Sequence, residues 1–139
     1  MTIVTLVDTG PLVAMLDRND AHHKWMVASL ASVTGALTTC EPVLTEVCFL
    51  LKRNYGAADA VFELLGQDLL RIEFDLASEY KRVQQLMGRY ADLPVSLADA
   101  CLVRMAELIP DSRVMTLDRD FTIYRRHGRQ TIPLLSPFD

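Results

Sequence analysis

The apolar run at residues 3–7, IVTLV, constrains the fold most, because it is short and ends in a carboxylate. Its residues are mostly β-branched or aliphatic and do not alternate with polar ones, which predicts a strand buried on both faces, as in parallel sheets. Asp8 ends the run, and Pro11 is well placed at the first position of a following helix. Ligands of open parallel sheets bind beyond the carboxyl ends of the strands, so Asp8 stands where a functional acid is expected.

Length and composition indicate one folded domain over residues 1–139. Half of the residues are hydrophobic and 23% are charged, which excludes a disordered chain. No apolar run reaches membrane-spanning length, and the N-terminus lacks the pattern of a signal peptide. We therefore expect a cytoplasmic protein without a membrane association.

Net charge and cysteine content limit the classes of function that the chain can have. The net charge of −4 argues against a general nucleic-acid binder, unless several acids gather around a cation. There is no glycine-rich phosphate loop. Cys40, Cys48 and Cys101 lack C-x-x-C spacing and have apolar neighbours, which is typical of small buried side chains with free thiols.

Segments predicted as strands alternate along the chain with segments predicted as helices. Strands are expected at residues 3–7, 36–39, 69–74, 113–117 and 131–135. Helices are expected at residues 11–16, 20–33, 41–54, 57–66, 76–91, 96–108 and 119–126. Strands that alternate with helices predict an α/β fold, a three-layer α/β/α domain around a mostly parallel central sheet.

Four carboxylates occupy places where an ordinary core or surface would not need them. Asp8 and Asp118 each end a strand, so in a parallel sheet both lie at the same edge. Glu46 shares a helix face with apolar residues, and Asp99 precedes a largely apolar helical stretch. Burying an isolated carboxylate is costly unless it is paired or binds a metal, so the four together indicate a shared cation.

Each acid also has a purely structural interpretation. Asp8 and Asp118 could cap the helices that follow them, and Asp99 completes a capping box with Ser96. Glu46 could face solvent if the helix were rotated by one residue. Asp8-Thr9-Gly10 has the letters of an aspartic-protease site, but that chemistry needs two such loops in an all-β fold, whereas this chain has one.

Basic residues cluster near the C-terminus. The run at residues 125–129, RRHGR, is usually a solvated face. With Arg119 close by, the three arginines Arg125, Arg126 and Arg129 could form a basic rim beside the acids that holds a phosphate backbone.

These motifs resemble the PIN domain family, in particular its small bacterial VapC-like ribonucleases. The resemblance rests on V-D-T-G-P near the N-terminus, T-E-V in the third helix, Y-A-D-L-P-V-S-L-A-D-A-C-L-V, and M-T-L-D-R-D-F-x-x-Y-R near the C-terminus. It covers nearly the whole chain. It implies a doubly wound parallel sheet, an acidic pocket that holds Mg²⁺ or Mn²⁺, and hydrolysis of RNA phosphodiester bonds.

The resemblance also implies roles for individual residues. Its acidic quartet corresponds to Asp8, Glu46, Asp99 and Asp118 as catalytic residues, with Asp8, Asp99, Asp118 and Asp120 as metal ligands. Thr9 and Thr116 match the hydroxyl residues that support the acids. Either Asp118 or Asp120 can be the fourth acid, and one or two metal ions can act.

Partners follow from the same resemblance. Such proteins are often toxins neutralised by an antitoxin, and a homodimer is also implied. A PIN nuclease without an antitoxin and a non-catalytic nucleic-acid-binding module stay open as alternatives. A receiver-type phosphoacceptor fits poorly, since Asp8 is followed by Thr9 and no lysine follows Lys81.

Overall fold

The centre of the protein is a parallel sheet of five strands in the order β3-β2-β1-β4-β7. The computed structural model describes residues 2–138, so the two ends of the predicted 1–139 domain lie outside the described residues. The strands are β1 (Val4–Val7), β2 (Leu37–Thr39), β3 (Leu70–Ile72), β4 (Ser112–Met115) and β7 (Leu134–Leu135). The prediction of a mostly parallel sheet is confirmed.

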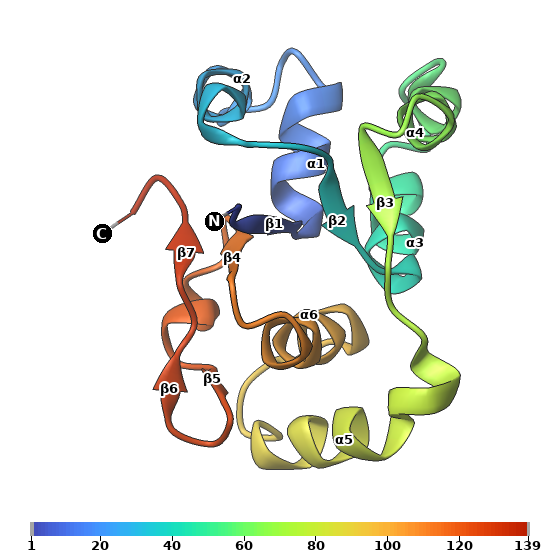
Figure 1. Ribbon diagram of the computed structural model, residues 1–139. Coiled ribbons are helices and arrows are strands. Elements are labelled where there is room, and N and C mark those ends of the chain that lie inside the picture. The colour runs from blue at the N-terminus through green and yellow to red at the C-terminus, as the bar shows by residue number, and fades with distance from the viewer. Residues whose placement is uncertain (1, 139) are drawn as a thin grey trace.

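Helices cover both faces of this sheet. They are α1 (Thr9–Leu16), α2 (His23–Ser29), α3 (Glu41–Leu50), α4 (Ala57–Gly66), α5 (Leu76–Arg89) and α6 (Leu97–Leu108). Figure 1 shows α1 and α2 on one side of the sheet and α5 and α6 on the other. Helix α3 starts at the carboxyl end of β2 and contacts both α1 and α6. The three-layer α/β/α architecture is therefore confirmed.

Strand β1 lies at the middle of the sheet, as its apolar composition predicts. Thr5, Leu6 and Val7 are fully buried. The chain passes from β1 to β2 and β3 on one side and then returns to β4 on the other side of β1. The strand order thus reverses between β1 and β4, and such a reversal opens a crevice at the carboxyl ends of the strands. Asp8 directly follows β1 at this crevice.

One predicted helix is shorter in the structure. The helix expected at residues 20–33 is α2, His23–Ser29, followed by a 3-10 turn η1, Leu30–Ser32. Asp20 does not cap this helix directly; its carboxylate accepts the backbone N–H of His22 in the preceding turn. Trp25 and Leu30 pack against the core, as predicted.

The C-terminal region differs most from the prediction. The prediction of a helix at residues 119–126 is wrong: only a short 3-10 helix, η2 (Arg119–Thr122), forms there. Strand β5 (Arg125–Arg126) instead pairs antiparallel with β6 (Gln130–Thr131). His127 and Gly128 adopt positive φ in the turn between them, which a helix cannot contain.

The last predicted strand, residues 131–135, is divided in two. Pro133 lies between β6 and β7 and has no N–H to donate to a ladder. Its carbonyl accepts the backbone N–H of Val114, so the chain joins the main sheet only at this point. Within residues 2–138, no helix combines the length and apolar character needed to cross a membrane. Cys40 and Cys101 are buried free thiols, as predicted, whereas Cys48 is a free thiol that is only half-buried.

Candidate active site

A cavity of about 480 Å³ lies at the crevice between β1 and β4. Five of its lining residues were predicted from the sequence as site residues with carboxylate or hydroxyl groups. The complete lining is Asp8, Thr9, Gly10, Glu46, Ser96, Asp99, Leu117, Asp118 and Arg119. The structure thus brings together the four acids of the predicted quartet from four separate elements.

Asp8 is held rigidly at the end of β1. Its Oδ1 accepts the backbone N–H of Thr9 at 2.8 Å, which caps α1, and its Oδ2 accepts the hydroxyl of Thr116 at 2.7 Å. Its own N–H donates to the carbonyl of Met115 on β4. Both carboxylate oxygens therefore have a fixed direction, and Thr116 lies where the supporting hydroxyl was predicted.

Glu46 reaches the cavity from α3. Its Oε1 accepts the hydroxyl of Thr9 at 2.6 Å, although the two residues are 37 positions apart in sequence. Glu46 is half-buried, and Val43 and Val47 on the same helix are fully buried. The helix phase assumed from the sequence is correct, and the alternative in which Glu46 faces solvent is wrong.

Asp99 is fixed in the first turn of α6 by a capping box. The hydroxyl of Ser96 accepts the N–H of Asp99, and Oδ2 of Asp99 accepts the N–H of Ser96, both at 3.0 Å. The buried hydroxyl of Tyr124 donates to the same Oδ2 at 3.4 Å.

Asp118 and Asp120 follow β4, and their positions differ. Asp118 lines the cavity, and its Oδ1 accepts the N–H of Asp120 and so caps η2. The N–H of Asp118 donates to the hydroxyl of Thr116, which also holds Asp8. Asp120 is half-buried and is not among the described residues that line the cavity.

Asp8, Asp99 and Asp118 do cap helices, as the structural interpretation predicts, but several carboxylate oxygens at the site are left without a hydrogen bond. Glu46 Oε2, Asp99 Oδ1 and Asp118 Oδ2 accept no hydrogen bond from the described part of the chain. Each of these residues is oriented through one oxygen while the other is available to a ligand. Capping and ligand binding are therefore compatible for the same side chain.

The cavity disfavours negative charge on its own acids. Burial, and then the neighbouring Asp99 and Asp118 carboxylates, raise the pKa of Asp8 to about 7, against the lowering effect of its hydrogen bonds. Burial is also the main cause that raises the pKa of Asp99, with Asp118 and Glu46 adding to it. Crowded carboxylates of this kind favour a cation or a shared proton. As the side chains are placed, no group of three or more His, Cys, Asp or Glu within residues 2–138 is arranged to hold a metal ion.

The Asp8→Asn variant is expected to be more stable than the natural chain above pH 7 in EDTA, by about 2 kcal/mol. The folded chain raises the pKa of Asp8 from 3.8 to about 7, so this group favours folding below pH 3.8 and loses that effect as pH rises through 7. Asparagine carries no such charge. Urea unfolding at pH 4 and pH 8 measures the difference, with the exposed Asp92→Asn as control. A variant less stable at both pH values would contradict the expectation.

Of the predicted basic rim, only Arg119 lines the cavity. Its guanidinium lies 4.8 Å from the ring centroid of Phe138, a cation–π contact. The side chain of Arg125 donates to the carbonyls of the three preceding residues, 122–124. The side chain of Arg126 donates to the carbonyls of Ala106 and Pro110. Arg129 is exposed, and it too is absent from the described lining of the cavity.

Three further residues at the site were not predicted. Ser96 was visible as a helix cap but not as a lining residue. Gly10 permits a close approach, because a Cβ there would lie 3.2 Å from the Leu117 side chain. Tyr124 is fully buried beside Asp99 and packs edge-on against Tyr90 and Phe121. Its position depends on the fold after β4, which no local pattern indicates.

The chain is similar to known proteins over most of its length. The PIN domain family model matches residues 5–126, which contain all four acids. The chain is 26% identical over 116 residues to Ribonuclease VapC26 of Mycobacterium tuberculosis, covering 82% of this chain and 86% of that protein. The structure of VapC20 from the same organism, a sarcin-ricin loop cleaving toxin, superposes with a TM-score of 0.76 at 24% identity. That match covers 86% of this chain and 93% of that one.

Proposed function

Because this chain belongs to the PIN domain family, as its motifs predicted, we propose that it is a divalent-metal-dependent endoribonuclease that hydrolyses RNA phosphodiester bonds. The observation that carries the proposal is the convergence of Asp8, Glu46, Asp99 and Asp118 on one cavity at the switch point of the sheet. RNA as the substrate class is supported by the similarity to VapC26, which is named a ribonuclease.

The donor set fits Mg²⁺ or Mn²⁺. Both ions prefer carboxylate oxygens with water in the remaining positions, and three of the acids have an oxygen without a hydrogen bond in the described chain. Asp99 and Asp118 would hold the ion through these oxygens, and Asp8 would hold it through the lone pairs that its two hydrogen bonds leave over. When bound, it would lower the pKa of the attacking water and stabilise negative charge on the leaving oxygen.

The side chains of this protein orient the remaining groups. Thr9 fixes Glu46, which would orient the attacking water or hold a second ion. Thr116 fixes Asp8 and the backbone of Asp118 together. Arg119, at the rim, would contact an RNA phosphate, and its guanidinium is preoriented by the Phe138 ring.

The experiment that tests this proposal uses a mixed pool of labelled single-stranded and structured RNAs with the purified protein. We expect cleavage with Mn²⁺ or Mg²⁺ and none with EDTA. Cleavage that continues in EDTA would contradict the metal dependence. If no RNA is cleaved, metal titration by calorimetry decides between two outcomes: metal binding would indicate a narrow substrate, and no metal binding would favour a non-catalytic PIN module.

Substitutions distinguish the roles of Asp118 and Asp120, the two acids after β4. Asp118→Asn is expected to reduce the cleavage rate by more than about 100-fold, because it removes a charge that lines the cavity. Asp120→Asn is expected to change the rate only a few-fold, since Asp120 supplies its backbone N–H to the site and asparagine keeps that group. Initial cleavage rates at saturating Mn²⁺ measure both. The reverse order would assign Asp120 as the fourth acid.

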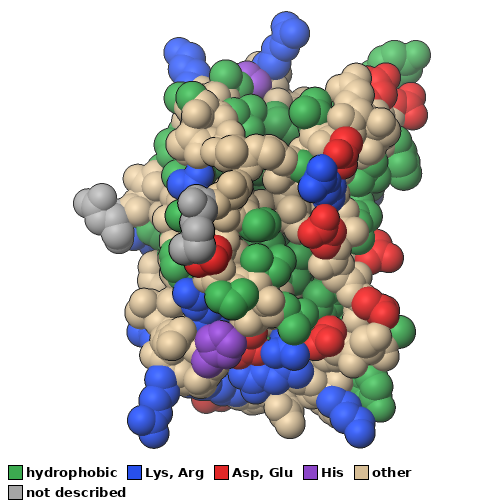
Figure 2. All heavy atoms as spheres, in the orientation of Figure 1, with side chains coloured by type: hydrophobic (Ala, Val, Ile, Leu, Met, Phe, Trp, Pro, Cys, Tyr) green, Lys and Arg blue, Asp and Glu red, His purple; other side chains and the backbone are tan. Residues whose placement is uncertain are grey.

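We also propose that the protein acts as the toxin of a toxin–antitoxin pair and forms a homodimer. VapC20 is described as a toxin. An exposed apolar patch, consisting of Phe49, Leu50, Tyr55 and Phe62, lies on and between α3 and α4. Figure 2 shows hydrophobic side chains gathered on this side of the surface over α4. Patches of this kind mark protein interfaces, and light scattering of the purified chain distinguishes a monomer from a dimer.

A further inference from the structure

A second hollow, of about 570 Å³, opens beside the acidic cavity and shares Glu46 with it. We call it the α3–α6 groove, and it is lined by Glu41, Pro42, Thr45, Glu46, Phe74, Asp75, Leu76, Ala77, Leu97 and Ala98. We propose that this groove binds one unpaired guanine base of the RNA substrate, next to the phosphate that lies over the acids. This inference rests on the proposed ribonuclease function.

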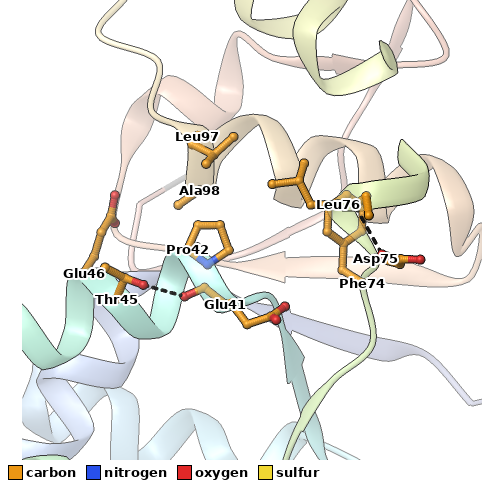
Figure 3. A pocket seen from close by; sticks show the side chains of 10 residues that line it. Glu41, Pro42, Thr45, Glu46, Phe74, Asp75, Leu76, Leu97 and Ala98 are labelled. Carbon is orange, nitrogen blue, oxygen red and sulfur yellow. Dashed lines mark hydrogen bonds between the residues drawn. The ribbon is translucent and has the colours of Figure 1, made fainter. Parts of the chain in front are cut away.

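The shape of the α3–α6 groove suits a flat ring. Leu97 and Ala98 on α6 lie opposite Pro42 on α3, with Phe74 and Leu76 toward one end and Glu46 at the other (Figure 3). The Leu97 side chain is 40% exposed, so its apolar surface is available. The volume lies in the range of ordinary small-ligand pockets, about 300–1,000 Å³. Proteins hold unpaired bases by stacking them on such aromatic and apolar surfaces.

The charge of the groove disfavours an anion and suits a group with N–H donors. No lysine, arginine or histidine is among its described lining residues, so a phosphate would meet only carboxylates there. Both oxygens of Asp75 are engaged, with the Ala77 N–H and the Ser78 hydroxyl. The carboxylate of Glu41 is exposed and accepts no hydrogen bond from the described residues, so both of its oxygens are available as acceptors, whereas Glu46 has only Oε2 available.

Guanine matches this acceptor best among the four bases. Its Watson–Crick edge presents two adjacent donors, N1–H and N2–H, that can pair with the two oxygens of one carboxylate. Adenine and cytosine each present one amino group, and uracil presents one ring N–H. Recognition of unpaired bases through this edge is the usual mode in RNA-binding proteins.

Continuity with the acidic cavity favours RNA over a basic peptide as the occupant. Ser96 lines the acidic cavity, and the next two residues on α6, Leu97 and Ala98, line the groove. A strand with its phosphate over Asp99 must place a neighbouring base close to this boundary. A basic peptide could also be attracted by Glu41 and Glu46, so the test includes one.

The first arm of the test is cleavage of an RNA library with randomised positions, followed by sequencing of the products. We expect the natural chain to prefer guanine at one fixed position beside the cut. Phe74→Ala and Glu41→Gln should each reduce that preference by about tenfold. The controls Val27→Ala on α2 and Glu63→Gln on α4, both at exposed positions, should leave it unchanged. Phe74 packs partly against the core, so Phe74→Ala can unfold the protein. Glu41 is exposed, so Glu41→Gln still tests the proposal in that case.

The second arm measures binding without cleavage, in EDTA, by fluorescence anisotropy. A uridine octamer with one central guanosine should bind about tenfold more tightly than the all-uridine octamer, and Glu41→Gln should remove the difference. Guanine-dependent binding without cleavage in the first arm would leave the inference standing and overturn the proposed nuclease. Cleavage without a guanine preference, or with one unchanged in both groove variants, would overturn the inference. Binding of a tetra-arginine peptide that depends on Glu41 and Phe74, with base preference unchanged, would assign the groove to a peptide and also overturn it.

Discussion

Asp99→Asn is expected to abolish RNA cleavage, with a loss of more than about 100-fold, while the protein stays folded. Asparagine has the same shape, and its side-chain oxygen can still accept the Ser96 N–H of the capping box. The substitution removes only the negative charge that Asp99 directs into the cavity. Helix α6 should therefore keep its start, and the metal should lose a ligand.

Initial cleavage rates in Mn²⁺ and thermal unfolding by circular dichroism measure these two effects separately. Asp92→Asn, at an exposed position between α5 and α6, is the matched control and should cleave at the natural rate. If the two preparations cleave at similar rates, a second purification must first exclude a contaminating nuclease. A rate that then stays within a few-fold of the natural chain would remove Asp99 from the site.

Glu107→Ala is expected to lower the free energy of unfolding by about 3 kcal/mol, the largest stability effect that we predict. Glu107 lies near the end of α6 with only 1% of its side chain exposed. Arg82 of α5 donates to both of its oxygens, at 2.9 and 2.7 Å, and Arg104 donates to Oε1 at 3.2 Å. The backbone N–H of His127 donates to Oε2 at 2.7 Å. This cluster connects α5, α6 and the β5–β6 turn, so one substitution weakens three contacts.

The pH dependence of this effect follows from the same contacts. Burial opposes the charge on Glu107, but the hydrogen bonds from Arg82, His127 and Arg104 outweigh it and lower its pKa from 4.5 to about 2. A lowered pKa means that the carboxylate stabilises the fold above pH 4.5, and that this contribution disappears as the pH falls to about 2. The difference between Glu107→Ala and the natural chain should be full at pH 7 and much smaller at pH 3.

Urea unfolding at the two pH values checks the expectation. Glu63→Ala, on the exposed face of α4, is the control and should change the stability by less than about 0.5 kcal/mol. A loss for Glu107→Ala that is equally large at pH 3 would show that the lost packing of the side chain, and not its charge, is responsible.

The sequence determined the central sheet and the acids at its edge, because both depend on short-range patterns. The apolar run before Asp8 has too little alternation for a half-exposed strand, and its last three residues, Thr5, Leu6 and Val7, are buried in the structure, whereas Ile3 at its start is exposed. Asp118 ends its strand in the same way, so a parallel arrangement alone places both acids at one edge. The capping box of Ser96 and Asp99 also depends on a local sequence motif, and it forms where that motif predicted it.

Only the tertiary structure decided which residues share the cavity and which do not. Asp118 and Asp120 are both acids that follow the same strand, but of the two only Asp118 lines the cavity. Arg126 looks like part of a solvated basic run, yet its side chain donates to the carbonyls of Ala106 and Pro110, which lie 20 and 16 positions earlier in the sequence. The α3–α6 groove combines residues from Glu41 to Ala98 and has no local signature. Periodicity and capping act over a few residues. The contacts that form the cavity and the groove depend instead on how separate helices pack across the sheet. A sequence pattern within one segment carries no information about that packing.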